Sequence, residues 1–291
     1  MNCISCGSTD FNSEYKGKIR SGRWPDLTKE TFSIVSCKKC ELAFLEPFPE
    51  IDYSESDYRK NYNNSDEINT YIITHDQEQT PRINKIGIEK FRRKKILDFG
   101  CGGGSFLDAV KGVSEHTVAV EPFKGYHSSL LQREHEVFSS SEEALNKYRK
   151  KIDIIVSFGV IEHVQDPNQF LQEAYELLVE GGELILETDN KDDFLMNMDL
   201  PEFKMFYYRT AHYWYFNEKS LKNLCINSNF RNIEMNYRHG YDLSNVFHWL
   251  LDKKPTGLAK TTGISSYSNE AWRLFLEESG QAELLHVTAT K

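Results

Sequence analysis

The sequence predicts an α/β protein built on a doubly wound, mostly parallel sheet, with a small cysteine-rich module in front of it. Short apolar segments alternate with helical segments from residue 95 to residue 187, which is the pattern of consecutive βαβ units. A glycine-rich segment, Gly100–Gly104, lies between the first apolar segment and the helix that follows it. Four of the six cysteines form two C-x-x-C pairs near the N-terminus. These observations set the fold class and indicate two places where a ligand binds.

Length and composition limit the class of protein further. A chain of 291 residues is long enough for one large domain, alone or with an appendage, and its 39% hydrophobic and 27% charged residues are ordinary for a globular protein. No apolar run reaches the roughly 18 residues that a membrane helix needs, and the first residues do not resemble a secretory signal. The net charge of −9 argues against a nucleic-acid polymer as partner. We therefore expect a cytoplasmic monomer or homodimer with a small-molecule partner and no membrane partner.

The cysteine pattern predicts a structural zinc site. Cys3 and Cys6 form one pair, and Cys37 and Cys40 form the other, so two tight turns can supply the four thiolates of a tetrahedral zinc ion. Gly7, directly after the first pair, allows the positive φ that helps such a turn. Disulfides are not expected without a secretory signal, and a redox C-x-x-C is expected once, beside a βαβ unit. With four ligands and no open position, zinc would fold this segment rather than take part in chemistry.

Composition divides the chain into three parts. Residues 1–50 are the expected zinc-binding module. Residues 51–95 are expected to be a linker and a helical cap, with one helix or a pair broken at Pro81. Residues 96–291 are expected to form the sheet domain, with insertions near residues 190–216 and 239–268.

Periodicity and turn signals predict the elements of the third part. The continuous apolar run Ile152–Phe158 is typical of a strand that is buried on both faces of a parallel sheet. Asp166 and Pro167 form a helix start signal. The expected strands are Lys95–Phe99, Thr117–Val120, Glu136–Phe138, Ile152–Phe158, Glu183–Glu187, Asn232–Tyr237 and Leu284–Thr288, and the expected helices are Ser105–Lys111, Tyr126–Glu134, Asp166–Leu178, Glu218–Asn227 and Glu270–Glu278.

The glycine-rich loop distinguishes between two classes of cofactor. Glycine at a strand-to-helix turn lets a ligand approach the backbone, and the helix N-terminus offers free N–H groups. A dinucleotide site needs glycine or alanine where this chain has Ser105. Asp98 suits a cationic ammonium group better than a pyrophosphate, and Glu121 ends the next strand, where a carboxylate can accept from both ribose hydroxyls. S-adenosylmethionine (SAM), with a ribose and an amino-acid part, therefore fits better than NAD.

Four segments together resemble the class I SAM-dependent methyltransferases. They are Asp98–Gly104, Val118–Pro122, Ser157–Pro167 and Leu178–Leu184, and they occur in the order and spacing of that family. The third segment is most similar to the branch of ubiquinone-biosynthesis O-methyltransferases and sugar methyltransferases. The resemblance covers roughly residues 67–237 and implies a Rossmann-like fold with a seven-stranded sheet. A four-cysteine module before such a domain is similar to deoxysugar methyltransferases that act on nucleotide-linked sugars.

The resemblance also implies which residues bind SAM. The loop after the first strand matches the family's contacts around the methionine part, and Glu121 matches the ribose carboxylate. Two serines after the third strand fall where the adenine amino group is met, and Phe158 falls where the fourth strand contacts the cofactor. The implied cofactor-binding residues are Asp98, Gly100, Cys101, Gly102, Glu121, Pro122, Ser139, Ser140 and Phe158.

Glu162 and His163 are the candidate catalytic pair, because they follow the fourth strand at the carboxyl edge of the sheet, where α/β enzymes bind ligands. SAM carries an activated methyl group, so the protein must hold the acceptor and remove a proton from its hydroxyl. The ordinary pKa of histidine suits a general base at neutral pH. Glu162 could orient a ring or help bind a divalent cation such as Mg²⁺. The alternative is that Glu162 caps the following helix and His163 packs under the cofactor.

The first insertion, which is rich in aromatic residues, contains a third catalytic candidate, His212. This insertion covers either the acceptor pocket or the core, and both interpretations stay open. Tyr58 and Tyr62 form a lid over the cofactor or pack at an interface. Arg82 meets the SAM carboxylate or, as we expect, lies on the surface. Residues 238–245 mix donors and acceptors that suit a polyhydroxylated ligand.

The expected function is SAM-dependent O-methylation of a sugar or of a nucleotide-linked precursor of a surface polysaccharide. C-methylation of a deoxysugar nucleotide is an alternative, although such enzymes carry a further C-terminal domain and a tyrosine where this chain has Val160. An NAD-dependent oxidoreductase is disfavoured by Asp98 and Ser105. A non-enzymatic binding module made of the zinc segment and a SAM fold is disfavoured by the intact glycine loop and Glu121.

Overall fold

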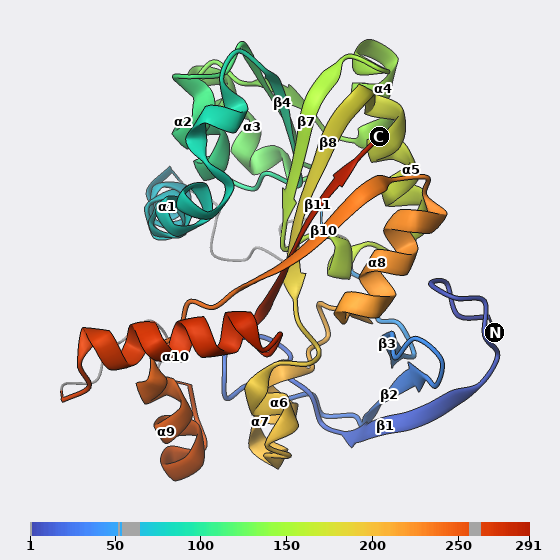
Figure 1. Cartoon of the computed structure of the whole chain (residues 1–291), viewed down its shortest axis with the longest axis vertical. Helices are drawn as coiled ribbons and strands as arrows, with labels where there is room; N and C mark the ends of the chain where they lie inside the picture. The colour runs from blue at the N-terminus through green and yellow to red at the C-terminus, as the bar shows by residue number, and fades with distance from the viewer. Residues whose placement is uncertain (1, 52, 54–64, 256–262) are drawn as a thin grey trace.

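The computed structural model describes residues 2–51, 53, 65–255 and 263–291, and a seven-stranded sheet organises most of them (Figure 1). Five of its strands, β4 to β8, run parallel, while β11 runs antiparallel to both β8 and β10. The mostly parallel sheet predicted from the sequence is thereby confirmed. The strand order is β10 (Arg231–Arg238), β11 (Leu284–Thr290), β8 (Leu178–Asp189), β7 (Ile152–Phe158), β4 (Lys95–Phe99), β5 (His116–Val120) and β6 (Glu136–Phe138).

Helices cover both faces of this sheet, because successive apolar side chains of a strand point to opposite faces. In β4, Ile96 packs into one buried cluster and Leu97 into the other. The Ile96 face is covered by α1 (Ser65–Ile86), the 3₁₀ turn Ile88–Phe91, α2 (Ser105–Lys111) and α3 (His127–Gln132). The Leu97 face is covered by α4 (Ser141–Tyr148), α5 (Pro167–Leu177) and α8 (Glu218–Asn227).

The strands and helices lie close to the predicted ranges, with two informative differences. Helix α1 continues through Pro81, so the alternative of a pair broken at that residue is wrong. Strand β8 begins at Leu178, well before the predicted Glu183, because Leu178 already pairs with Ile152 of β7. The register then shifts before Ile154 pairs with Glu183, so the residues between them form an irregular stretch within one strand.

A second, four-stranded antiparallel sheet contains the cysteine-rich segment. It consists of β1 (Phe11–Gly17), β2 (Phe32–Cys37), β3 (Ala43–Glu46) and β9 (Trp214–Tyr215), in that order. Strand β9 comes from the aromatic insertion, so distant parts of the chain complete this sheet. The predicted division of the chain at residue 50 stays a prediction.

The remaining helices lie beyond the carboxyl end of β8 in Figure 1. Their apolar side chains join those of the small sheet in a separate buried cluster, which includes Ile34, Tyr208 and Trp249. Among the described residues, no helix combines the length and the apolar character needed to cross a bilayer. The helices are α6 (Phe194–Asn197), α7 (Pro201–Tyr207), α9 (Leu243–Asp252) and α10 (Ser266–Glu278).

Candidate active site

A cavity of about 610 Å³ opens at the carboxyl ends of β4, β5, β7 and β8. Its volume lies within the range of about 300–1,000 Å³ that small-molecule sites have. Parallel strands place their following loops at this edge of a sheet, and the chain reverses its direction across the sheet between β4 and β7. Of the predicted cofactor residues, Gly100, Gly102, Glu121, Pro122 and Phe158 line the cavity.

The glycine loop is narrow because other side chains already lie against it. Gly100 has φ of 82°, and a Cβ there would lie 2.6 Å from a methyl carbon of Val160. A Cβ on Gly102 would lie 2.8 Å from the hydroxyl of Tyr71, which belongs to α1. Any side chain at either position would displace its neighbour, so the glycines keep open the space beside the loop.

Glu121 holds this loop in place. Its carboxylate is 1% exposed and accepts from the backbone N–H of Gly102 at 2.8 Å and from that of Phe123 at 2.9 Å. A carboxylate has about four acceptor positions, so further hydrogen bonds to a ligand remain sterically and chemically open to it. The structure therefore brings the predicted ribose acceptor to the cavity wall.

Asp98 lies behind the loop and does not line the cavity. Burial raises the pKa of Asp98 to about 7, with the charge of Arg82 opposing this shift and that of Glu121 adding to it. A cation next to this carboxyl would favour its ionised form.

Three other predicted cofactor residues lie away from the cavity wall. Cys101, Ser139 and Ser140 are half-buried and do not line the cavity. Ser140 caps α4 by accepting from the N–H of Glu143 at 3.3 Å, and the N–H of Ser139 donates to the carboxylate of the same Glu143 at 2.8 Å. The structure thus gives the two serines a local role, and their contact with an adenine stays a prediction.

Arg82 is 6% exposed, so the expectation of a surface arginine is wrong. Its guanidinium lies 4.2 Å from the centre of the Phe158 ring and donates to Glu187 at 2.7 Å. Arg238 donates to both oxygens of the same carboxylate at 2.7 Å. Burial opposes ionisation of Glu187, but the bonds from Arg238 and the charge of Arg82 hold its pKa well below the usual range.

Sequence reasoning missed the face that α1 presents to the cavity. Tyr71, His75, Glu78 and Arg82 all line it, at the spacing of one helical face. That spacing is visible in the sequence, but only Arg82 was singled out from it. The two tyrosines predicted to form a lid, Tyr58 and Tyr62, lie outside the described residues.

Glu162 and His163 form a short 3₁₀ turn directly after β7, and both line the cavity. The Nδ1 atom of His163 lies 2.6 Å from the carbonyl oxygen of Ala211. Because a carbonyl can only accept, Nδ1 carries the proton and the lone pair of the neutral ring is on Nε2. Tyr53 lies beside this pair, since its hydroxyl donates to the same carbonyl at 2.6 Å.

Glu162 is almost fully buried, at 3% exposure, and accepts from the hydroxyl of Thr188 at 2.8 Å. Burial, with the nearby charge of Asp189, raises the pKa of Glu162 to about 8. The alternative that Glu162 caps the following helix is wrong, because Asp166 caps α5 by accepting from two backbone N–H groups.

His212 lies behind His163 rather than at the cavity wall. The two rings meet edge to face with their centres 4.5 Å apart, and His212 is fully buried. Burial, together with the charge of Arg209, lowers the pKa of His212 well below its usual value. The carboxylate of Glu162 and both imidazoles have ligand atoms within 4.8 Å of one another, which is a spacing that a cation could use.

The aromatic insertion covers both the cavity and the core. Phe203, Phe206 and Tyr207 line the cavity, whereas Tyr213 and Phe216 are buried in the cluster beneath the sheet. Its two predicted roles therefore belong to different residues. From the predicted polar segment, residues 238–242 and 245 also line the cavity.

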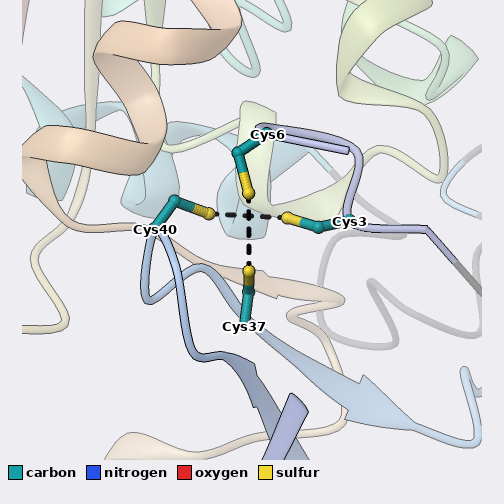
Figure 2. A group of neighbouring side chains, drawn as sticks. All are labelled: Cys3, Cys6, Cys37 and Cys40. Carbon is teal, nitrogen blue, oxygen red and sulfur yellow. Dashed lines mark hydrogen bonds between the residues drawn. The ribbon is translucent and has the colours of Figure 1, made fainter. Parts of the chain in front are cut away.

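The four N-terminal cysteines converge on one point (Figure 2). The sulfur atoms of Cys3 and Cys40 are 3.4 Å apart, those of Cys6 and Cys37 are 3.5 Å apart, and all four lie within 4.8 Å of one another. Tetrahedral zinc with bonds of about 2.3 Å separates its sulfur ligands by about 3.8 Å. The four cysteines are free thiols, so the predicted absence of a disulfide agrees with this geometry.

Both cysteine turns have the same backbone geometry. The residue after each pair has a positive φ, 72° at Gly7 and 64° at Glu41, and donates its N–H to the carbonyl of the first cysteine at 2.8 Å. At Cys37, burial opposes ionisation of the thiol, but backbone N–H groups, led by that of Cys40, lower its pKa to about 7. The donor set and the turns therefore fit a zinc ion.

A comparison with known protein families decides the class of the chain. A family model described as a methyltransferase domain matches residues 74–235, which is more than half of the chain. The chain belongs to this family. The predicted resemblance to SAM-dependent methyltransferases is thereby confirmed.

The methyltransferase domain also has curated relatives, over part of its length. It is 33% identical over 107 residues to the mitochondrial ubiquinone biosynthesis O-methyltransferase of Rattus norvegicus, a match that covers 33% of this chain and 31% of that protein. It is 28% identical over 114 residues to the ubiquinone biosynthesis O-methyltransferase of Ruegeria pomeroyi, covering 37% of this chain and 46% of that protein. The matches thus span less than half of these relatives.

Solved structures confirm the Rossmann-like fold of the methyltransferase. One neighbour is a SAM-dependent methyltransferase of Thermotoga maritima, described as a possible histamine N-methyltransferase, with 17% identity and a TM-score of 0.53. That match covers 80% of this chain and 99% of the neighbour. A SAM-dependent methyltransferase of Archaeoglobus fulgidus, also 17% identical, has a TM-score of 0.53 and covers 76% of this chain and 99% of its own.

The cavity of the methyltransferase fits SAM, the cofactor of this fold. The glycine loop leaves the backbone accessible, and Glu121 brings a carboxylate to the wall beside it. The two arginines on Glu187 carry one more positive charge than that carboxylate balances, which suits a ligand with a carboxylate group.

Proposed function

We propose that this protein is a SAM-dependent O-methyltransferase whose acceptor is a sugar or a nucleotide-linked precursor of a surface polysaccharide. The observation that carries the proposal is the position of His163, at the wall of a cavity that also contains the glycine loop and Glu121. The names of the curated relatives support transfer to oxygen.

SAM would lie along the loop after β4. In this proposal Asp98 and the loop backbone around Gly100 and Gly102 hold the amino-acid part, and Arg82 neutralises its carboxylate. Glu121 accepts from the ribose hydroxyls. SAM supplies a methyl group that is already activated on a sulfonium, so the side chains need only bind, orient and move a proton.

His163 would act as the general base. With Nδ1 donating to Ala211, the lone pair on Nε2 can accept the proton of an acceptor hydroxyl. Its partner Ala211 fixes the plane of the ring, and His212 supports the ring from behind. The catalytic candidates Glu162 and His212 are therefore proposed to position His163, and a divalent cation such as Mg²⁺ on the three residues is a further proposal that their spacing permits.

The proposed acceptor class rests on the other half of the cavity. Aromatic rings, among them Phe206 and Trp249, line it beside the polar segment 238–242. Rings that cover apolar faces, together with side chains that bond hydroxyls, suit a carbohydrate. C-methylation of a deoxysugar nucleotide stays the alternative. Bound zinc, a cytoplasmic location and a monomeric or dimeric state complete the proposal.

Mass spectrometry tests the function directly. The purified protein would be incubated with SAM and a panel of nucleotide-linked sugars, free sugars and phenolic hydroxyl compounds. We expect a gain of about 14 Da, the mass of the CH₂ that transfer adds, on a sugar of the panel. Base-labile loss of the methyl group is not expected from an ether, and fragmentation would show whether oxygen or carbon carries it. Methylation of the phenols alone would contradict the sugar assignment.

Replacement of the proposed base separates catalysis from binding. His163→Ala should lower kcat about 10²–10⁴-fold, which is the usual contribution of a positioned base, while SAM affinity stays nearly unchanged. In the wild type, kcat should fall as the pH drops through the histidine pKa, and this dependence should vanish in the variant. A packing role predicts instead a loss of stability and SAM affinity at unchanged kcat. If His212→Ala abolishes turnover while His163→Ala does not, the base is misassigned.

A further inference from the structure

Two arginines lie directly opposite each other at the acceptor side of the cavity. The N–H of Arg20 donates to the carbonyl of Tyr208 at 2.9 Å, and the N–H of Thr210 donates to the carbonyl of Arg20 at 3.0 Å. This is a parallel bridge in which Arg20 faces Arg209. Both residues line the cavity, although one comes from the cysteine-rich segment and the other from the aromatic insertion.

Two like charges at facing positions destabilise the pairing of the backbone. Asp189 is the carboxylate that partners this pair, through a bond of 2.8 Å from Arg209. The neighbouring Glu162 is bonded by Thr188. Two guanidinium groups against one carboxylate leave about one positive charge uncompensated in a half-buried place, which is unfavourable in the absence of a ligand.

Arg20 is held in position without being neutralised. Its guanidinium carbon lies 4.2 Å from the centre of the Phe206 ring, so the ring supports one face of the flat group. Its Nε is buried and has no hydrogen-bond partner among the described residues. Burial and the charge of Arg209 lower the pKa of Arg20 to about 10, so the group is still charged at neutral pH.

We propose that Arg20 and Arg209 form a subsite that binds a phosphate group of the acceptor. The forked donors of two guanidinium groups match the oxygens of a phosphate, and such a group would neutralise the charge that Asp189 leaves over. The subsite shares the cavity with His163. This proposal rests on the proposed function and narrows it, because the acceptor is then a sugar phosphate or a nucleotide-linked sugar rather than a free sugar.

Calorimetry with inorganic pyrophosphate tests the subsite without any methyl transfer. The full chain saturated with S-adenosylhomocysteine should bind pyrophosphate, and Arg20→Gln should weaken this binding about tenfold to a hundredfold, the loss expected of charge-assisted hydrogen bonds. Arg209→Gln should weaken it comparably. Arg23→Gln is the matched control, because Arg23 is exposed on the same N-terminal segment, and its affinity should equal that of the wild type.

Thermal unfolding distinguishes binding from a structural role. Without pyrophosphate, Arg20→Gln should melt at the same temperature as the wild type or higher, since it removes one of two facing like charges. Its pyrophosphate-induced rise in melting temperature should be lost. A lower melting temperature with an unchanged pyrophosphate effect would make Arg20 structural and overturn the proposal. Malonate that binds more tightly than pyrophosphate, and through the same arginines, would identify a carboxylate site and overturn it also.

The same measurements keep this proposal separate from the proposed function. If pyrophosphate binds through Arg20 but no sugar of the panel is methylated, the function fails and the subsite stands. If free sugars are methylated as well by Arg20→Gln as by the wild type, and pyrophosphate does not bind, the subsite fails and the function stands.

Discussion

Asp98 shows how a single buried carboxyl can make cofactor binding depend on pH. It lies at the end of a central strand and is 3% exposed. Because burial raises its pKa to about 7, roughly half of the molecules carry a neutral Asp98 near neutral pH. An ammonium group bound beside it would favour the ionised form, so binding and loss of a proton are coupled.

We therefore expect SAM affinity to fall as the pH drops below about 7. The folded-state pKa lies above the ordinary value, so the proton is held up to about pH 7 and has to leave when the cation binds. For one such group, affinity should decrease about fivefold to tenfold between pH 7.5 and pH 6, as measured by calorimetry. Asp98→Asn should bind SAM weakly and lose this dependence. An affinity that is constant over this range would remove Asp98 from the site.

At the scale of residues, the sequence predicted what local motifs encode. The glycine loop, Glu121 and the pair after β7 are each adjacent to a recognisable strand end, and all of them line the cavity except Asp98 and Cys101 of the loop. Arg20, Arg209 and Arg238 were not predicted as site residues. Each reaches the cavity through pairings between distant segments, which no local pattern reveals.

Among the elements, α1 is the least expected, because it continues through a proline. Proline lacks an N–H and its ring crowds the carbonyl four residues earlier. The helix persists because residues on both sides of Pro81 are held by tertiary contacts. Gln79 and Arg82 are buried and bonded to each other at 2.8 Å, and Ile83 packs against the sheet. Tertiary packing thus overrides the local signal from which the break was predicted.

Replacement of this proline should stabilise the protein. Pro81 is exposed, so Pro81→Ala removes no buried contact and restores one backbone donor. We expect the free energy of unfolding to rise by about 1–3 kcal/mol, as measured by urea denaturation. Asn84→Ala, at an exposed position of the same helix, is the control and should gain only about 0.5 kcal/mol from helix propensity. A decrease for Pro81→Ala would mean that a bend at this residue is needed to position Arg82.

The boundaries of the strands were predicted better than their partners. The apolar runs fixed β4, β7 and most of β11 from the sequence, because burial on both faces leaves a continuous pattern. Strand β9 was not predicted, since two residues are too few for any periodicity. It is nevertheless the strand that joins the two sheets.

For the whole molecule, the cysteine cluster and the acceptor side of the cavity form one structure. Strand β3 pairs with β9, and the N–H of Leu45 donates to the carbonyl of Tyr213 at 2.9 Å. The first cysteine turn is bonded to α8, where the hydroxyl of Ser5 donates to the carbonyl of Ser220 at 3.0 Å. The segment that carries Arg209 is thus fixed from the side of the cysteines.

We expect zinc loss to damage the acceptor site more than the SAM site. Elemental analysis should find about one zinc per chain. Cys37→Ser should lower the zinc content and raise the acceptor KM about tenfold to a hundredfold, since small displacements of positioning groups have effects of that size. SAM affinity should change little, because β4 and β5 lie in the other sheet. Cys225→Ala, the control, should keep its zinc. Full activity at zero zinc would refute this coupling.

The pairing of β3 with β9 also constrains the order in which the protein can fold. Ala43 pairs with Tyr215, so this contact closes a loop of more than 170 residues. During synthesis the cysteine turns, which need only residues 3–40, can assemble as soon as they leave the ribosome. Their sheet must wait for its last strand until most of the remaining chain has been made. The N-terminal segment is thus the first part able to form and among the last to be completed.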